Sequence, residues 1–215
     1  MARAMIALPA SLTGHPIVPV VVIDDAGFAV DAAAALAAGG IGCIEITLRT
    51  PAALDAIAAI AAAGSLLVGA GTVLSPDDLS RVQDAGAQFV ITPGVDREVI
   101  DLALARGVDI LPGTATATDV QAVLRSGLSA VKLFPADRLG GLGMISALAG
   151  PFPDVAFVPS GGVSFENIAA YLAHPNVPAV SGSWMATRNL LASRDVDTIE
   201  RLSREAVVLA GGAAG

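Results

Sequence analysis

The sequence predicts an α/β protein with a single-domain (β/α)8 fold, the TIM barrel. Eight short apolar runs recur along the chain at a spacing of roughly two dozen residues, and each has the length of a buried strand. Segments rich in Ala and Leu, of helical length, lie between them. Polar residues collect at the carboxyl ends of the runs, where barrels of this fold carry their sites. The runs are 17–23, 41–47, 66–72, 89–94, 109–113, 130–136, 156–162 and 179–184.

The segments between the runs carry the start signals of helices. Thr50-Pro51 and Ser75-Pro76 each place a capping hydroxyl before a proline at the first helical position. A further helix is expected to begin near Phe165, after a Gly-Gly pair. The other predicted helices are 29–38, 52–63, 76–85, 98–105 and 119–126.

Alternating strands and helices favour a parallel sheet, and eight units are the number that closes a barrel. The rival is an open doubly wound sheet. Its dinucleotide-binding fingerprint is not met, because the run from Gly69 to Leu74 lacks the third glycine and no acidic residue follows at the required place. We therefore expect one domain over residues 1–215, with an N-terminal helix or arm over about 1–16 and a frayed tail over about 211–215.

Composition excludes several classes of partner. Hydrophobic residues make up 54% of the chain, but no apolar run reaches the ~18 residues of a membrane span. The net charge of −8 argues against nucleic acid and anionic membranes. The apolar part of the N-terminus is too short for a secretory signal, so we expect a cytoplasmic location. His15, His174 and the lone Cys43 form no metal-binding pattern, and we expect neither a metal nor a cofactor.

Lys132 is the one charged residue of the apolar run 130–136. A buried cation is costly unless it is paired, neutralised or used, and a buried amine that loses its proton can form a Schiff base with a carbonyl. Glu45 stands between two isoleucines in the run 41–47. Strand alternation sends both charged side chains to the face opposite their apolar neighbours, which is the barrel axis. The pair is then either a structural salt bridge or an amine nucleophile with an acid/base group beside it.

Further polar residues follow the strand-like runs. Arg49 offers a fork of donors to a carboxylate or phosphate, unless it is a surface arginine. Thr72 either binds a substrate oxygen or caps the next turn. The sequences Ser160-Gly161-Gly162 and Ser181-Gly182-Ser183 follow the last two runs. Loops at these two places form a phosphate site in many barrels, although two ordinary tight turns are the alternative.

Four motifs together resemble the 2-keto-3-deoxy-6-phosphogluconate (KDPG) aldolases, a family that includes 4-hydroxy-2-oxoglutarate aldolases. They are Glu45-Ile-Thr-Leu-Arg49-Thr-Pro51, Gly69-Ala-Gly-Thr72-Val-Leu74, Val131-Lys132-Leu-Phe134-Pro135-Ala136 and Ser160-Gly161-Gly162-Val163. The resemblance runs from about Ile17 to Trp184. It implies a metal-independent class I aldolase on a (β/α)8 barrel, assembled as a homotrimer.

The resemblance also implies a role for each matching residue. The Schiff-base lysine falls on Lys132 and the general acid/base on Glu45. The contacts to the pyruvyl carboxylate fall on Arg49 and Thr72, and the pocket lining on Pro93 and Phe134. The phosphate loop matches Ser160, Gly161, Gly162 and Ser183. This chain departs from the family at Ser160, where many relatives have Thr, and at Thr114, where a small apolar residue is expected.

The predicted reaction is cleavage of KDPG to pyruvate and glyceraldehyde 3-phosphate through an imine on Lys132. Within the family, the substrate is alternatively 4-hydroxy-2-oxoglutarate or a 6-phosphogalactonate-type keto acid. Outside it, a phosphosugar isomerase or epimerase shares the barrel and the phosphate loops, and a non-catalytic barrel that binds a phosphorylated metabolite is a further alternative.

Overall fold

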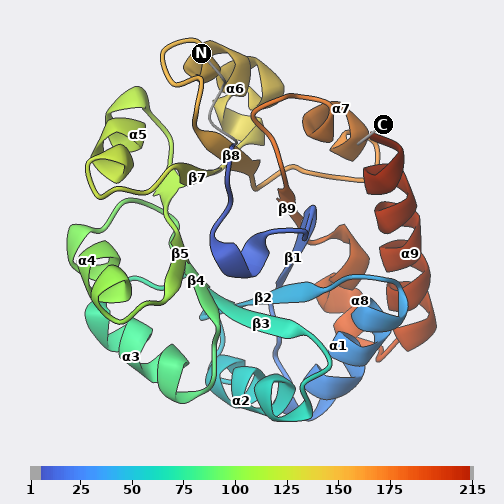
Figure 1. The fold of residues 1–215 in the computed structure, drawn as a ribbon. Coiled ribbons are helices and arrows are strands. Elements are labelled where there is room, and N and C mark those ends of the chain that lie inside the picture. Colours follow the sequence, from blue (N-terminus) through green and yellow to red (C-terminus); the bar gives the residue numbers. More distant parts are fainter. Residues whose placement is uncertain (1–5, 214–215) are drawn as a thin grey trace.

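The computed structural model describes residues 6–213, and its strands are all paired in parallel (Figure 1). Six strands form one sheet in the order β5-β4-β3-β2-β1-β9, and three form a second in the order β6-β7-β8. The strands are β1 (Ile17–Val21), β2 (Cys43–Thr47), β3 (Leu67–Gly71), β4 (Phe89–Ile91), β5 (Asp109–Leu111), β6 (Gly113–Thr114), β7 (Ala130–Leu133), β8 (Ala156–Pro159) and β9 (Val180–Gly182).

The two sheets are parts of one closed barrel. β5 and β6 are successive pieces of one strand, interrupted at Pro112, which has no N–H to give to a ladder. β5 pairs with β4, and β6 pairs with β7 on the other side. A parallel bridge between Ser160 and Ser181 joins the end of β8 to β9. Eight strand positions therefore close into a ring, which confirms the predicted (β/α)8 fold.

Helices surround the barrel on its outside (Figure 1). Ile44, Ile46, Val131 and Leu133 point outward into the core that the helices share with the sheet. A second cluster, which includes Val18, Cys43, Phe89, Ala130 and Val158, fills the barrel interior. The helices are α1 (Ala29–Ala38), α2 (Ala53–Ala63), α3 (Pro76–Asp84), α4 (Arg97–Ala105), α5 (Ala117–Leu124), α6 (Gly141–Ala149), α7 (Ile168–Leu172), α8 (Arg188–Ala192) and α9 (Val196–Ala213).

The predicted helix starts have mixed outcomes. The Ser75 side chain caps α3 by accepting a hydrogen bond from the Asp78 N–H at 3.1 Å, as predicted. The corresponding prediction for Thr50 is wrong: its hydroxyl donates to the Ile23 carbonyl, and α2 begins only at Ala53. The Thr50 hydroxyl, which the sequence pattern predicted to cap the helix, instead donates to a backbone carbonyl of the loop after β1.

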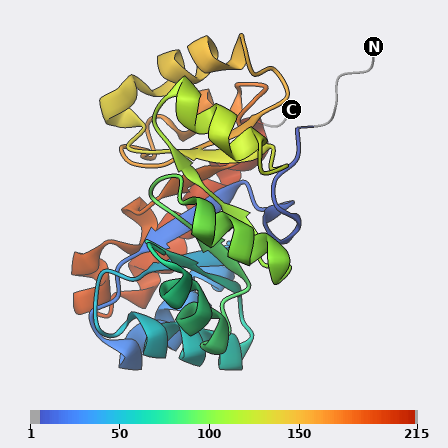
Figure 2. The same ribbon diagram turned by 90° about the vertical axis from the view of Figure 1, so that its left-hand side faces the viewer.

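The ends of the chain differ in part from the predicted arm and tail. α9 continues to Ala213, so residues 211–213 are helical rather than part of a tail, and 214–215 lie outside the described residues. Residues 1–5 of the predicted arm lie outside them too. In the described part, a short 3-10 helix, η1 (Ala10–Leu12), covers one end of the barrel (Figures 1 and 2).

The η1 segment closes the end of the barrel where the strands begin. Leu12 is buried in the interior cluster, and the Ser11 N–H donates to the Asp109 carboxylate at 2.6 Å. The carboxyl ends of the strands lie at the opposite end, so the functional side chains face the other mouth. Within residues 6–213, no helix is both long enough and apolar enough to cross a bilayer.

Candidate active site

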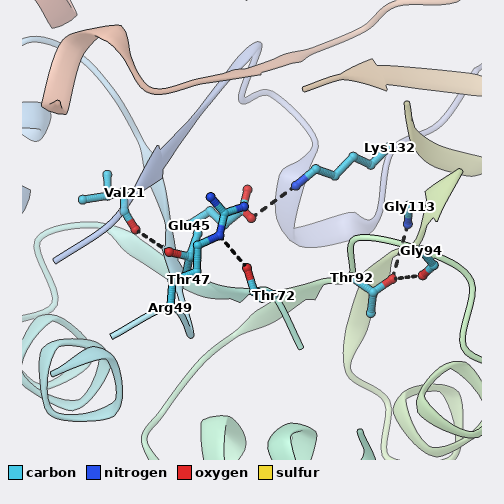
Figure 3. Close-up of polar contacts among 9 residues, drawn as sticks. All are labelled: Val21, Glu45, Thr47, Arg49, Thr72, Thr92, Gly94, Gly113 and Lys132. Carbon is cyan, nitrogen blue, oxygen red and sulfur yellow. Dashed lines mark hydrogen bonds and ion pairs between the residues drawn. The ribbon is translucent and has the colours of Figure 1, made fainter. Parts of the chain in front are cut away.

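The two inward charges meet inside the barrel. Lys132 on β7 places its Nζ 3.4 Å from Oε1 of Glu45 on β2, as Figure 3 shows. Their side chains are 5% and 1% exposed, so the pair lies in the interior rather than at the surface. Strand alternation predicted this encounter, because the apolar neighbours of both residues point outward.

Only one oxygen of the Glu45 carboxylate contacts Lys132. Oε2 is buried and has no hydrogen-bond partner among the described residues. A β-carbon at residue 71 would overlap this side chain, so Gly71 on the neighbouring strand β3 provides the space that the carboxylate occupies. An unpaired carboxylate oxygen is costly in the apolar interior, and it is also an acceptor available to a bound molecule.

Cys43 lies two residues before Glu45 on β2 and takes no part in this chemistry. Its thiol is buried and donates to the Ile17 carbonyl at 3.5 Å. Burial, together with the nearby Glu45 charge, raises the pKa of the Cys43 thiol to about 12. A thiol that stays protonated is a poor nucleophile. The lysine amine is therefore the nucleophile that this part of the interior offers.

Phe134 follows β7 and stands beside the amine. The Lys132 Nζ lies 5.2 Å from the centroid of its ring. This contact restricts the lysine side chain from one side while Glu45 holds it from another. Thr114 on β6 donates its hydroxyl to the Lys132 carbonyl at 3.1 Å. The unexpected Thr114 thus takes part in the hydrogen bonding between β6 and the strand that carries the lysine.

Arg49 and Thr72 lie together at the ends of β2 and β3. The Arg49 Nε donates to the Thr72 hydroxyl at 3.2 Å (Figure 3). Thr72 has a φ of 60°, in the left-handed region that residues other than glycine rarely adopt. Such conformations collect at functional sites, where the surrounding structure enforces them. The guanidinium and the hydroxyl are close enough to act on one oxyanion.

The loop after β8 accepts hydrogen bonds from the segment that follows β7, and this fixes the direction of its backbone N–H groups. The Ser160 and Gly161 carbonyls accept hydrogen bonds from the N–H groups of Ala136 and Asp137, at 2.8 and 3.0 Å. In a trans peptide the next N–H points the opposite way, so the N–H groups of Gly161 and Gly162 are directed away from that segment. They face the side of β9, where the parallel bridge between Ser160 and Ser181 lies.

Only glycine fits comfortably at these two positions. Gly161 and Gly162 have φ values of 90° and 80°, and a β-carbon at residue 162 would overlap Asp137. The helix expected near Phe165 begins only at Ile168, because Asn167 closes the intervening turn by donating to the Gly162 carbonyl. The donors that this loop could offer to an anion are therefore its own backbone amides rather than a helix end.

These groups surround one cavity of about 120 Å³. Its lining carries two cations, Lys132 and Arg49, and no carboxylate, which suits a molecule with anionic ends. The remaining lining residues are Val20, Phe134, Ser160, Gly161, Gly162, Val163, Ser181, Gly182 and Ser183.

Three of the predicted site residues stand outside this lining. Glu45 is connected to the cavity through its ion pair with Lys132. Thr72 is connected to the cavity through Arg49. Pro93, at the end of β4, packs its backbone against Gly113, where a β-carbon would not fit. Gly113 is in turn the register partner of Lys132, and register partners direct their side chains to the same face, so Pro93 covers β6 on the interior side of the barrel, beside the strand of the lysine.

No individual role was predicted for Val20, Gly71 or Ser181, although Ser181 was part of the polar loop predicted after the last run. The first two carry no signal in sequence, since apolar and glycine residues are common at strand ends. Ser181 did carry one, because it precedes Ser183 by two residues and alternation places both on the same face.

The fold and the site define a class of protein: a (β/α)8 barrel enzyme in which a buried lysine amine, held by a carboxylate, faces a cavity suited to anionic carbonyl compounds. Comparison with known sequences makes the assignment specific. The family described as KDPG and KHG aldolase matches residues 8–202, and the chain belongs to this family.

Individual relatives agree with this assignment. The chain is 44% identical to a 2-dehydro-3-deoxy-phosphogluconate aldolase of Treponema pallidum, over 96% of this chain and 99% of the relative. It is 43% identical to a KHG/KDPG aldolase of Escherichia coli, over 91% and 92% of the two chains. A crystal structure of KDPG aldolase from Legionella pneumophila, with pyruvate captured as a covalent carbinolamine intermediate, superposes with a TM-score of 0.88. It is 37% identical, and the match covers 91% of this chain and 95% of that one.

Proposed function

We propose that this protein is a class I aldolase that cleaves KDPG to pyruvate and glyceraldehyde 3-phosphate through a Schiff base on Lys132. The observation that carries the proposal is the Nζ–Oε1 distance of 3.4 Å between Lys132 and Glu45 inside the barrel. A nucleophilic amine and a proton-transfer group within reach of each other are what imine chemistry requires.

The reaction begins when the deprotonated Lys132 amine attacks the C2 ketone of the substrate. Glu45 delivers a proton to the departing oxygen, water leaves, and the iminium that forms draws electrons from the C3–C4 bond. The C4 hydroxyl gives its proton to Glu45, whose Oε2 is free to accept it. The C3–C4 bond breaks, the aldehyde leaves, and the remaining enamine is protonated and hydrolysed to pyruvate and free lysine.

The two ends of the substrate bind to different parts of the cavity. Arg49 and Thr72 hold the carboxylate end, and their mutual hydrogen bond fixes their relative position. The backbone N–H groups of the Gly161–Gly162 loop, together with the Ser160 and Ser183 hydroxyls, hold the phosphate. Phe134 lines the side of the reacting carbon, and Pro93 packs against Gly113 on the strand beside the lysine strand. Orientation of both ends supplies part of the rate.

Trapping with borohydride tests the mechanism. We expect pyruvate and borohydride to leave a stable reduced adduct on Lys132, identified by peptide mass spectrometry. Lys132→Met supplies the control and should give no adduct at that position. Glu45→Gln should remain folded and cleave KDPG at a rate lower by about two to four orders of magnitude. An unmodified Lys132, under conditions that label a known class I aldolase, would exclude the proposed imine and would favour an isomerase or a binding protein.

A second substrate within the family is 4-hydroxy-2-oxoglutarate. The observation in its favour is the composition of the distal site, where amides and hydroxyls bind a carboxylate as well as a phosphate. We expect phosphorylated KDPG to be preferred, because a dianion gains more than a monoanion from the donors of the loop. The ratio of kcat/KM for the two substrates measures this preference.

We further propose that the chain forms a homotrimer and acts in the cytoplasm, on a phosphorylated keto acid rather than on nucleic acid or membranes. The resemblance to the family supports the trimer, and the net charge of −8 supports the choice of substrate class. Sedimentation equilibrium measures the assembly.

A further inference from the structure

Ser181 is a buried polar residue that the mechanism described above does not use. Its side chain is fully buried, it belongs to the lining of the catalytic cavity, and its hydroxyl has no hydrogen-bond partner among the described residues. We propose that Ser181 binds the C4 hydroxyl of the substrate and thereby sets the preference between substrates that differ in configuration at C4. The inference rests on the proposed aldolase function.

The position of Ser181 follows from the register of β9. It pairs with Val18 on β1 and, through the bridge that closes the barrel, with Ser160 after β8. Ala179, two residues earlier, belongs to the interior cluster, whereas Val180 packs outward among the helices. Ser181 therefore points inward. It lies deeper in the barrel than Ser183, which follows the carboxyl end of β9.

The substrate is oriented so that its aldehyde-derived half reaches β9. Its carboxylate end lies with Arg49 and Thr72 at the ends of β2 and β3, and its phosphate lies with the loops after β8 and β9. The chain between them crosses the interior from the Lys132 amine toward Ser183. Because Ser181 is deeper than Ser183, it stands beside the carbon nearer the imine, which is C4.

Glu45 and Ser181 approach that carbon from two sides. Their strands, β2 and β9, both pair with β1, so the two strands are about 10 Å apart along the barrel wall. Both side chains point inward from there, over Val20, which lines the same cavity. The C4 hydroxyl then donates its proton toward Glu45 while its oxygen accepts a hydrogen bond from the Ser181 hydroxyl. Inversion at C4 turns the hydroxyl away from this pair.

Desolvation makes the contact selective. A buried hydroxyl without a partner has already lost its hydrogen bonds to water, so a substrate hydroxyl that reaches it restores a bond at no further cost in desolvation. A substrate of the other configuration leaves the Ser181 hydroxyl unpaired. Sites that contain such groups discriminate more strongly than apolar pockets do.

The test measures kcat/KM of wild type and Ser181→Ala for 2-keto-3-deoxy-6-phosphogluconate and for its C4 epimer, 2-keto-3-deoxy-6-phosphogalactonate. We expect Ser181→Ala to lower kcat/KM for the preferred epimer about five- to tenfold, the worth of one neutral hydrogen bond. The other epimer should change much less, so the ratio between the two moves toward one. Ser181→Cys, with a weaker donor of similar shape, should give an intermediate ratio.

Ser126→Ala is the matched control. The Ser126 hydroxyl is likewise buried without a partner among the described residues, but it follows α5 and lies outside the lining of the cavity. It should leave the epimer ratio of the wild type unchanged. Thermal melting of all variants identifies any loss of folded protein.

The outcomes separate the two proposals. A wild type that cleaves neither epimer refutes the proposed function itself, together with this inference. An active wild type whose epimer ratio is unchanged in both Ser181 variants, or whose kcat/KM falls equally for both epimers, refutes the role of Ser181 alone.

Discussion

At the scale of single residues, the site depends on which side chains are absent as much as on which are present. The Glu45 carboxylate occupies space that any side chain at residue 71 would fill. Its Oε1 reaches Lys132 and its Oε2 is left free, so a small displacement would change both contacts. The reactive pair is therefore positioned by a residue that has no functional group.

Gly71→Ala tests this dependence. The added methyl group should push the Glu45 carboxylate away from Lys132, and we expect kcat/KM for KDPG to fall about 100-fold, as is typical of displacements near 1 Å. Gly143→Ala, in α6, is the matched control, because a β-carbon there meets no neighbour within 4 Å. It should leave kcat/KM unchanged and stabilise the helix slightly. A folded Gly71→Ala protein with wild-type kcat/KM would contradict the positioning role.

At the scale of elements, period and alternation predicted most of the architecture. Each apolar run contains a strand, and the inward direction of Glu45 and Lys132 followed from their neighbours. The break at Pro112 and the extra strand β6 were not predicted. The sequence does not show that the residues before Pro112 pair with β4 while those after it pair with β7. Thr50 shows the same limit: a local cap signal loses to an acceptor on a loop distant in sequence.

Ser75 shows the opposite case, in which the local signal prevails. Its hydroxyl accepts from the Asp78 N–H, and the Asp78 carboxylate in turn accepts from the Leu74 N–H at 3.2 Å. We expect Ser75→Ala to lower the free energy of unfolding by about 1 kcal/mol, as is usual for loss of an N-cap. Ser75→Asp, which keeps an acceptor, should restore most of it. Urea unfolding measures both, and an unchanged midpoint for Ser75→Ala would show that the cap is unimportant.

At the scale of the whole molecule, the residues that line the catalytic cavity and the apolar residues that stabilise the barrel interior lie toward opposite ends of its axis. The charged and polar lining residues lie toward the carboxyl ends of the strands, whereas the opposite end is packed with apolar side chains. Sequence order placed the first group correctly, because strand ends can be read from the chain. The closure of the other end could not be predicted from the strand ends, since it depends on η1, which precedes the first strand and is not part of the strand–helix repeat.

Leu12→Ala tests this separation. Leu12 is 1% exposed and packs into the interior cluster with Val18 and Cys43. Its truncation leaves a cavity that rigid strands cannot fill, so we expect the free energy of unfolding to fall by about 2–5 kcal/mol. The melting temperature should drop by roughly 2–4 °C for each kcal/mol.

The catalytic rate should change far less, because no residue of the interior cluster that contains Leu12 lines the catalytic cavity. At 25 °C we expect kcat/KM of Leu12→Ala to stay within about threefold of wild type, since the variant remains folded at that temperature. Leu124→Ala, at an exposed position on α5, controls for loss of a leucine without a cavity and should change neither quantity much. If Leu12→Ala lost activity at a temperature where it is fully folded, the two ends of the barrel would be coupled, and η1 would have to be counted among the elements that position Lys132.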